Sequence, residues 1–434
     1  MINISKGKGL KEMNKFPRIL LILLILELLC GVSCMFKGKL TDKERDLLKN
    51  IEKFNRDYGS KGVTIKNREI DWDEKFVCNG LILKNSLIKN VELVMVDLRN
   101  TYIEDSVIEN VSISEKSDLR GSTFKNVKFK NFKCINNYAL PSRLRNSIFI
   151  DCEFINCEYS YVTLGKEYRN CKFTKIKEIE EVSYYDTIVT DSIFTNCELN
   201  SGYGDARFEN VIFKDGIVRG AFSLRNGKSK NIQFINCLTR FGISGNIENI
   251  LIQNSKPNDD AEIGFEGDMK NIIIKDCPEI SRFIFKKGVF NNVSIINCKY
   301  PVTGFYNVKL SNLLIKDSIV QHFKFEESDV SGENRVENSE IWGNFYDESK
   351  VRNLTIANCK FKFYVNIALS ELIRLRLVNN IYESQAKDHP RYPGEVRYAV
   401  VGERFIDSDK FPLESTPFPE HIQRYYENGK KINK

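Results

Sequence analysis

The sequence predicts an all-β protein whose chain coils into a solenoid, and two periodicities carry that prediction. From Leu81 onward a large apolar residue recurs at every fifth position, and a small or β-branched residue usually stands two positions before it. Neither a helix nor an ordinary strand has a period of five. The five-residue unit therefore predicts a chain that turns a corner every five residues. The large residues of the first run are Leu83, Ile88, Leu93, Leu98, Ile103, Ile108 and Ile113, followed after one inserted residue by Leu119, Phe124 and Phe129.

A longer period of about twenty residues runs through the second half of the chain. A phrase of Asn or Asp followed by a small residue returns every 18 to 22 residues. Four five-residue units make one such period, so both periods describe the stacked turns of one solenoid. A single turn cannot bury its own apolar edge, and stability then sums over neighbouring turns. The small residues are Cys197, Gly216, Cys237, Ser255, Cys277, Cys298, Ser318, Ser339 and Cys359.

This pattern resembles the pentapeptide-repeat family. The resemblance implies a right-handed, four-sided parallel β-helix over residues 76–382, and it implies little about activity because the shared residues are packing residues. Some members of the family mimic duplex DNA with a strongly acidic rod and bind DNA gyrase. This chain has a formal charge of +7 without a concentrated basic stripe. We therefore expect neither that activity nor a nucleic-acid partner.

The residue before each small residue of the longer period is Asn or Asp, and no two Asp are neighbours in that column. In a stacked solenoid the amides of such a column can hydrogen-bond along it. Neighbouring ionised Asp would repel one another across a single strand spacing. We interpret the column as a structural ladder, and a metal-binding or catalytic acidic stripe is the alternative. Its members are Asn196, Asp215, Asn236, Asn254, Asp276, Asn297, Asp317, Asn338 and Asn358.

Residues 1–33 are typical of a secretory signal peptide. Basic residues precede an apolar stretch, 19–29, that only Glu27 interrupts, and a small-residue site follows. The stretch is shorter than the ~20 residues of a transmembrane helix. Its end, Gly31-Val32-Ser33-Cys34, resembles a bacterial lipoprotein signal. That resemblance implies lipidation of Cys34 and an anchor in a membrane of the bacterial cell envelope.

Two questions about the N-terminus stay open. The start is Met1 or Met13, and the second would give a shorter signal. The alternatives to a lipoprotein are a secreted or periplasmic protein and a cytoplasmic protein with a buried N-terminal helix.

The regions on either side of the repeats are predicted to be caps. Residues 34–75 are a linker and a capping helix over 41–58, in which Thr41 and Glu44 make a capping box and Gly59 ends the helix. Residues 383–434 lose both periods and hold half of the prolines, which interrupt sheets. We expect a C-terminal cap and tail there, and the family resemblance allows a homodimer through this region.

Nine cysteines fall on or near the inward positions of the repeat, where Ser, Val, Ala and Gly replace them. A free cysteine behaves as a small buried hydrophobe. Zinc sites need closely spaced ligands such as CxxC, which the chain lacks. We therefore predict buried thiols without disulfides. The nine are Cys134, Cys152, Cys157, Cys171, Cys197, Cys237, Cys277, Cys298 and Cys359.

No motif of a known catalytic, metal-binding or cofactor-binding site occurs, so we predict a chain that is not an enzyme and has no cofactor and no metal. The leading hypothesis is an envelope scaffold or binding protein that contacts an unknown protein or glycan. The alternatives are an envelope polysaccharide-active β-helix enzyme and a cytosolic protein that binds a DNA-processing enzyme. Interruptions of the repeat, including Glu178–Tyr185, are candidate contact loops. The candidate contact residues in such loops are Tyr138, Arg143, Arg145, Tyr184, Tyr185 and Tyr203.

Overall fold

The computed structural model is almost entirely β and divides into two compact units, Met1–Val218 and Arg219–Lys434. The units are described separately below. The structure describes residues 2–4, 38–39, 51–59, 63–71, 78–94, 96–113, 117–135, 144–160, 165–180, 182–183, 186–202, 206–257, 262–278, 282–299, 302–368, 370–382, 397–401, 404–409, 426–427 and 430–431.

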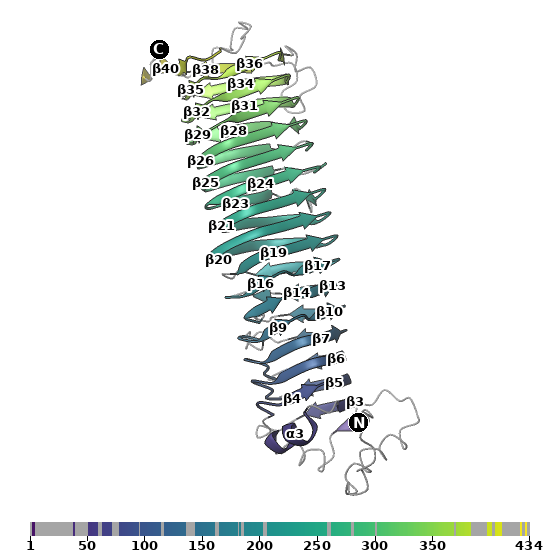
Figure 1. Cartoon of the computed structure of the whole chain (residues 1–434). Helices are drawn as coiled ribbons and strands as arrows, with labels where there is room; N and C mark the ends of the chain where they lie inside the picture. The colour runs from purple at the N-terminus through teal and green to yellow at the C-terminus, as the bar shows by residue number, and fades with distance from the viewer. Residues whose placement is uncertain are drawn as a thin grey trace, which may run out of the picture. The chain divides into compact units, whose positions relative to one another are not determined.

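Unit 1 contains one described helix and a series of short strands that stack in chain order (Figure 1). The strands from β4 to β19 pair in parallel with strands about twenty residues away. The elements are β1 (Ile2–Ile4), β2 (Gly38–Lys39), α3 (Ile51–Tyr58), β3 (Val63–Asp71), β4 (Ile82–Lys84), β5 (Leu87–Val94), β6 (Tyr102–Ile113), β7 (Thr123–Lys130), β8 (Lys133–Ile135), β9 (Ile148–Ile150), β10 (Glu153–Ile155), β11 (Glu158–Ser160), β12 (Glu167–Arg169), β13 (Lys172–Thr174), β14 (Lys177–Glu180), β15 (Val182–Ser183), β16 (Ile188–Thr190), β17 (Ile193–Thr195), β18 (Glu198–Gly202) and β19 (Arg207–Lys214).

Unit 2 has the same construction, with longer strands that bend through corners (Figure 1). Its stacked strands are parallel, and β40 and β41 form a separate antiparallel pair. The strands are β20 (Ile217–Ile235), β21 (Leu238–Gln253), β22 (Lys256–Pro257), β23 (Glu262–Glu266), β24 (Met269–Lys275), β25 (Arg282–Ile296), β26 (Val302–Lys316), β27 (Ile319–Val320), β28 (His322–Glu326), β29 (Asp329–Ser331), β30 (Asn334–Glu337), β31 (Glu340–Asp347), β32 (Lys350–Arg352), β33 (Leu354–Ala357), β34 (Lys360–Ala368), β35 (Glu371–Ile373), β36 (Arg376–Val378), β37 (Ile381–Tyr382), β38 (Arg397–Val401), β39 (Arg404–Ile406), β40 (Tyr426–Glu427) and β41 (Lys430–Lys431).

The predicted parallel β-solenoid is confirmed within each unit, and the large residues of the five-residue repeat form its inward columns. In unit 1 Ile108 pairs with Phe129, and Phe129 with Phe154. In unit 2 Phe285 pairs with Phe305, and Phe305 with Phe325. All of these side chains are buried. Because identical positions of successive turns stack, a column of aromatic residues forms ring stacks, with centroids 4.7 Å apart for Phe129 and Phe154.

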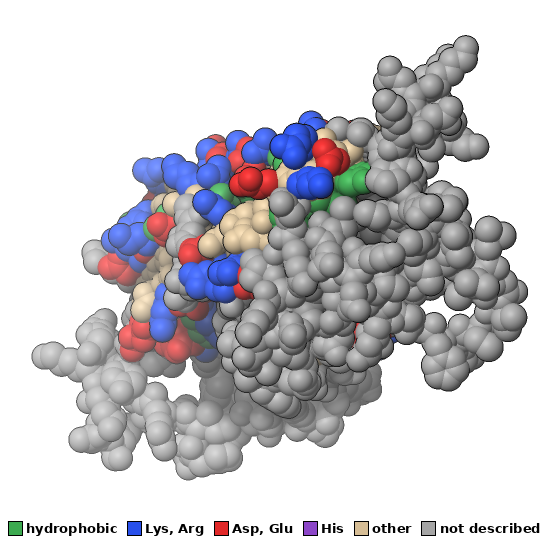
Figure 2. Space-filling view, turned by 90° about the horizontal axis from the view of Figure 1, so that it is seen from below, with side chains coloured by type: hydrophobic (Ala, Val, Ile, Leu, Met, Phe, Trp, Pro, Cys, Tyr) green, Lys and Arg blue, Asp and Glu red, His purple; other side chains and the backbone are tan. Residues whose placement is uncertain are grey.

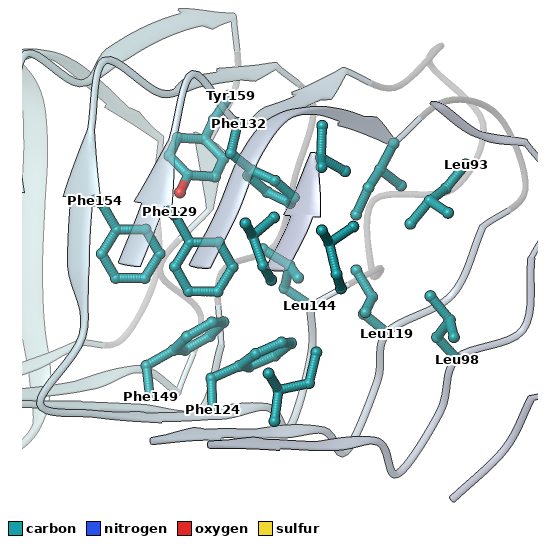
Figure 3. Close-up of a pocket in the computed structure, with 15 residues that line it drawn as sticks. Leu93, Leu98, Leu119, Phe124, Phe129, Phe132, Leu144, Phe149, Phe154 and Tyr159 are labelled. Carbon is teal, nitrogen blue, oxygen red and sulfur yellow. The ribbon is translucent and has the colours of Figure 1, made fainter. Parts of the chain in front are cut away.

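The interior of unit 1 changes from aliphatic to aromatic along the chain (Figure 3). Leu98 and Leu119 lie in the aliphatic part, and Phe124 and Phe149 stack in the aromatic part with ring centroids 4.8 Å apart. An apolar cavity of about 50 Å³ lies where the two parts meet. Its lining offers almost no hydrogen-bonding groups, so a water molecule inside it would lack the partners it needs.

Nearly every corner is made by a residue in the left-handed region of φ. Examples are Asn90 at 55° and Asn110 at 52° in unit 1, and Asn254 at 47° in unit 2. Among residues with a side chain, Asn and Asp tolerate this region best, because their short polar groups can hydrogen-bond locally. The backbone turn itself therefore favours Asn and Asp at these positions, although a few other residues such as Lys175 and Glu327 also adopt it.

The parallel pairing extends beyond both edges of the predicted repeat range. Strand β3 pairs with β5, with Ile65 opposite Ile88 and Ile70 opposite Leu93. At the other end β39 pairs with β35, with Leu372 opposite Phe405. Strand β1, inside the predicted signal peptide, pairs antiparallel with β3.

Helix α3 contacts the first strands of unit 1 through one asparagine. The side-chain amide of Asn55 donates to the carbonyl of Gly80 at 2.8 Å, and its oxygen accepts from the backbone amide of Ile82 at 2.7 Å. Phe54 of the same helix is buried. The described helix begins at Ile51, so Thr41 and Glu44 of the predicted capping box lie outside the described residues.

The nine predicted cysteines, together with Cys78, are buried and free, which confirms the thiol prediction. Eight of these thiols make the bond that buried serines of the repeat make, donating to the carbonyl two residues earlier. The thiol of Cys152 donates to the carbonyl of Ile150 at 3.3 Å, as the hydroxyl of Ser318 donates to the carbonyl of Lys316 at 2.8 Å. Burial raises the pKa of Cys78, Cys157, Cys197 and Cys359, so these four thiols stay protonated at neutral pH.

Candidate binding surface

The outward faces of unit 1 carry charges that alternate in sign from turn to turn. Lys84, Glu104 and Lys125 occupy one column, and both lysines lie 2.8 Å from a carboxylate oxygen of Glu104. These hydrogen bonds and charges lower the pKa of Glu104 to about 2. Parallel register produces this arrangement, because it places residues about twenty positions apart at one strand spacing, ~4.8 Å.

Other columns repeat the alternation. Lys128 lies 2.7 Å from Glu153, and Lys133 lies 2.8 Å from Glu158. Figure 2 shows basic and acidic side chains interspersed on the face that it presents. Such a surface has no strong field of one sign, so it does not select a partner by net charge.

At one corner of unit 1 the asparagines form a continuous ladder. Asn110 donates to Asn90 at 2.8 Å, Asn131 to Asn110 at 2.7 Å, and Asn156 to Asn131 at 2.6 Å. These side-chain bonds confirm in unit 1 the kind of structural ladder that the sequence predicts for the later turns. In unit 2 the same ladder appears, with Asn254 donating to Asn236 at 2.7 Å.

A neighbouring corner of unit 1 carries a ladder in which Asp and Asn alternate. Asn126 donates to Asp105 at 2.8 Å, and Asn170 donates to Asp151 at 2.7 Å. In both bonds the donor belongs to the later turn. In the same column Asn210 donates to Asp191 at 2.7 Å.

A surface groove of about 460 Å³ runs along the alternating ladder over four successive turns of unit 1. The Asp/Asn column lines one side of it, and the column of Lys128, Glu153 and Lys172 lines the other. The lining residues are Asp105, Ser106, Val107, Asn126, Val127, Lys128, Asp151, Cys152, Glu153, Asn170 and Lys172.

The groove combines fixed hydrogen-bond donors and acceptors with nearly balanced charge. Lys128 is paired with Glu153, and Lys172 makes no ion pair within the described part of the chain. No cluster of His, Cys, Asp or Glu suited to a metal ion occurs among the described residues. The groove therefore suits a ligand that hydrogen-bonds without carrying a large charge.

Most of the contact residues predicted from the sequence lie outside the described residues. These are Tyr138, Arg143, Tyr184, Tyr185, Tyr203 and the predicted lipidation residue Cys34. Arg145 is described and exposed, and its backbone carbonyl accepts from the amide of Gly121 at 3.1 Å.

Glu178, which opens one of the predicted contact loops, is buried rather than projecting. It takes an inward position opposite Tyr159, and its carboxylate accepts from the backbone amide of Asn200 at 2.8 Å. The local sequence could not show this, because a glutamate in an irregular stretch is normally exposed.

The groove residues were missed by the sequence analysis, although a signal for them exists. Asp105 and Asp151 each precede a small buried residue, Ser106 and Cys152, as the members of the later Asn/Asp column do. The turn from Asn126 to Asp151 takes 25 residues, so a search at a fixed period does not connect them.

No family model matches the chain, and no curated protein matches it. Among solved structures it is similar to a mutant tailspike protein of E. coli bacteriophage HK620 in complex with pentasaccharide. The identity is 10%, the match covers 82% of this chain and 77% of the tailspike, and the TM-score is 0.27.

Two further similar structures are the catalytic domain of a GH87 alpha-1,3-glucanase and the A-module of the Azotobacter vinelandii mannuronan C-5 epimerase AlgE6. The glucanase shows 9% identity, with 88% of this chain and 70% of that chain covered and a TM-score of 0.25. The epimerase shows 10% identity, with 87% and 98% covered and a TM-score of 0.19. Likeness at these identities and TM-scores says nothing of activity or ligand.

The prediction that the chain is not an enzyme is corrected here, because the solved structures to which it is similar include a glucanase catalytic domain. The lack of a known motif in the sequence does not exclude catalysis. Among the described residues no helix is long and apolar enough to span a membrane.

Proposed function

We propose that this chain is a cell-envelope solenoid that binds an elongated envelope polymer, a glycan or a protein, along the groove of unit 1. One observation carries the proposal: the groove presents rows of polar side chains that the stacked backbone fixes at one strand spacing. A rigid row of donors and acceptors loses little conformational entropy on binding. Such a surface matches a ligand that repeats along its length.

We also propose that the solenoid is of the four-sided pentapeptide-repeat type. Support comes from the register of the early turns, where Leu83 pairs with Ile103, Ile88 with Ile108, and Leu93 with Ile113, so that pairings recur every five residues. The hydrogen bonds of Asn55 to the first strands support a capping role for α3, because an uncovered solenoid end exposes unpaired strand edges.

Location in the envelope rests on the N-terminal sequence. A signal peptide that is cleaved before a lipidated Cys34 would remove β1 and leave β3 paired with β5. The lipid would then hold the solenoid at a membrane surface. Secretion without a lipid is the alternative location.

The test of this proposal combines anchoring with binding. Cys34→Ala should abolish incorporation of labelled fatty acid and should shift the protein out of the membrane fraction or leave it unprocessed. Cys30→Ala is the matched control, and it should change neither result. The purified chain should sediment with isolated envelope fragments. If the chain stays soluble in the cytoplasm and does not sediment with the fragments, the proposal is wrong.

A second candidate function is cleavage of the bound polymer, which one feature of the groove favours. Carboxylates from two columns, Asp151 and Glu153, line the same groove. Paired carboxylates are the groups that most glycosidases use. Release of new reducing ends from an envelope glycan by the purified chain, and its loss in Asp151→Asn, would establish this activity.

A further inference from the structure

We propose that the groove of unit 1 binds a neutral oligosaccharide that runs along the solenoid, with its hydroxyl groups donating to Asn126 and Asp151 and accepting from Lys172. This inference deepens the proposed function and rests on it, because it names the ligand class and the residues that contact the ligand.

The first step is the direction of the side-chain ladders. In every bonded junction named above, the amide of the later turn donates to the residue of the earlier turn, as Asn170 donates to Asp151 at 2.7 Å. An ionised Asp has no proton to donate. Asp151 therefore cannot bond back to Asn126, and the amide of Asn126 already donates to Asp105 at 2.8 Å.

The junction of Asn126 and Asp151 therefore brings together two acceptors without a donor. The equivalent junction of the neighbouring ladder, Asn131 with Asn156, is closed by a bond of 2.6 Å. The open junction lies in the lining of the groove, where a ligand can reach it. A ligand that supplies a donor at this position gains a hydrogen bond that the protein alone does not make.

The charges of the lining select the kind of donor. An ammonium ligand would meet Lys172, for which the described residues provide no ion pair, and an anionic ligand would meet Asp105 and Asp151. A hydroxyl group carries no charge, donates to a carboxylate or an amide oxygen and accepts from an ammonium. Neutral sugars carry many such groups, so they can hydrogen-bond both to the Asp/Asn column on one side of the groove and to Lys172 on the other.

The orientation follows from the spacing. The groove spans four turns, represented by Asp105, Asn126, Asp151 and Asn170, at ~4.8 Å for each step. A hexose unit is about as long as one step. An oligosaccharide that lies along the axis therefore finds polar side chains of these two columns beside each of its sugar units. One that lies across the turns finds them beside a single unit.

The test uses the purified full chain and neutral oligosaccharides of four to six glucose, galactose, mannose or N-acetylglucosamine units, with binding followed by calorimetry. Asp151→Asn keeps the left-handed corner, accepts from Asn170 and donates to Asn126, so it closes the open junction. We expect at least tenfold weaker binding of any oligosaccharide that binds the natural chain. The matched control is Asp317→Asn in unit 2, which keeps the acceptor for Asn338 and adds a donor toward Asn297, with both neighbours outside the groove lining, and it should bind as the natural chain does.

The outcomes separate the inference from the proposed function. If a saccharide binds and Asp151→Asn leaves its affinity unchanged, or Asp317→Asn weakens it equally, the groove is not the site and the inference is wrong. If no oligosaccharide binds while the chain still sediments with envelope fragments, the inference is wrong and the proposed function stands. If neither binding is seen, both are wrong.

Discussion

One hydrogen bond of the asparagine ladder in unit 1 can be removed by replacing a single side-chain NH2 group with oxygen. Asn131 donates to Asn110 at 2.7 Å and accepts from Asn156 at 2.6 Å. Asn131→Asp keeps the size, the acceptor and a residue type that tolerates the φ of 53° at this corner. The only function lost is the donation to Asn110.

The expected cost is that of one partly exposed hydrogen bond. Such bonds contribute about 0.5–1.5 kcal/mol, and the bond from Asn156 to a charged acceptor offsets part of the loss. We expect the variant to unfold about 0.5–1 kcal/mol more easily at pH 7. For a unit of about 200 residues this lowers Tm by roughly 1–4 °C.

The pH dependence identifies the cause. The protonated form of the introduced carboxyl can donate to Asn110, so folding favours that form and raises its pKa above the unfolded value of about 3.9. The stabilisation by this proton is fully present below the unfolded pKa and is lost as the pH rises through the folded pKa. The difference in Tm from the natural chain should therefore close near pH 3.

Thermal melts by circular dichroism at pH 3 and pH 7 test this reasoning, with Asn131→Ala as the control. Alanine has neither donor nor acceptor, so its deficit should persist at both pH values. If Asn131→Asp shows the same deficit at pH 3 as at pH 7, the ladder bond is not what the substitution removes.

Three further predictions concern the core, the charged columns and the thiols. Phe305→Asp buries an unpaired charge in an aromatic stack, so it should lower the Tm of unit 2 by many degrees, and an unchanged melt would disprove the column assignment. Because the pKa of Glu104 is lowered to about 2, its stabilisation is present above the usual carboxylate pKa and is lost as the pH falls toward 2. Glu104→Gln should therefore melt below the natural chain at pH 7 and together with it near pH 2, and equal melts at pH 7 would refute this. Burial raises the pKa of Cys157 to about 12, so a thiol reagent should label the cysteines of the repeat only after denaturation, and rapid labelling of the native chain would contradict their burial.

The inward columns and the buried thiols could be predicted from the sequence because each depends on a spacing of five. The inward positions of Phe305 and Cys298 follow from their place in the five-residue repeat, and both side chains are buried in the structure. Glu178 is a charged residue at an inward position, where the repeat normally has an apolar one. Its carboxylate accepts a hydrogen bond from the backbone amide of Asn200, a residue of the next turn. No local pattern shows that partner.

The groove could not be predicted because it depends on which turns are neighbours. That Asn126 lies next to Asp151 can be predicted only if the register between their two turns is known. The segment that joins these turns is longer than those beside it, so the sequence does not give that register. Strand β3 was missed for a related reason. Ile65 and Ile70 are five residues apart, but the stretch between them and Leu81 interrupts the phase.

The long turn has a consequence for how this architecture can change. Phe129 and Phe154 are 25 positions apart, whereas Phe154 and Phe173 are 19 apart, and yet all three rings stack with centroids 4.7 Å apart. Chain length within a turn is thus decoupled from the rise of the stack, since strands β8 and β9, before and after the longer segment, both keep register with neighbouring turns. Peptide segments could be grafted between β8 and β9, or the chain lengthened there by natural insertion, without moving the stacked rings of the neighbouring turns. The solenoid can gain new surface in this way while its interior stays the same.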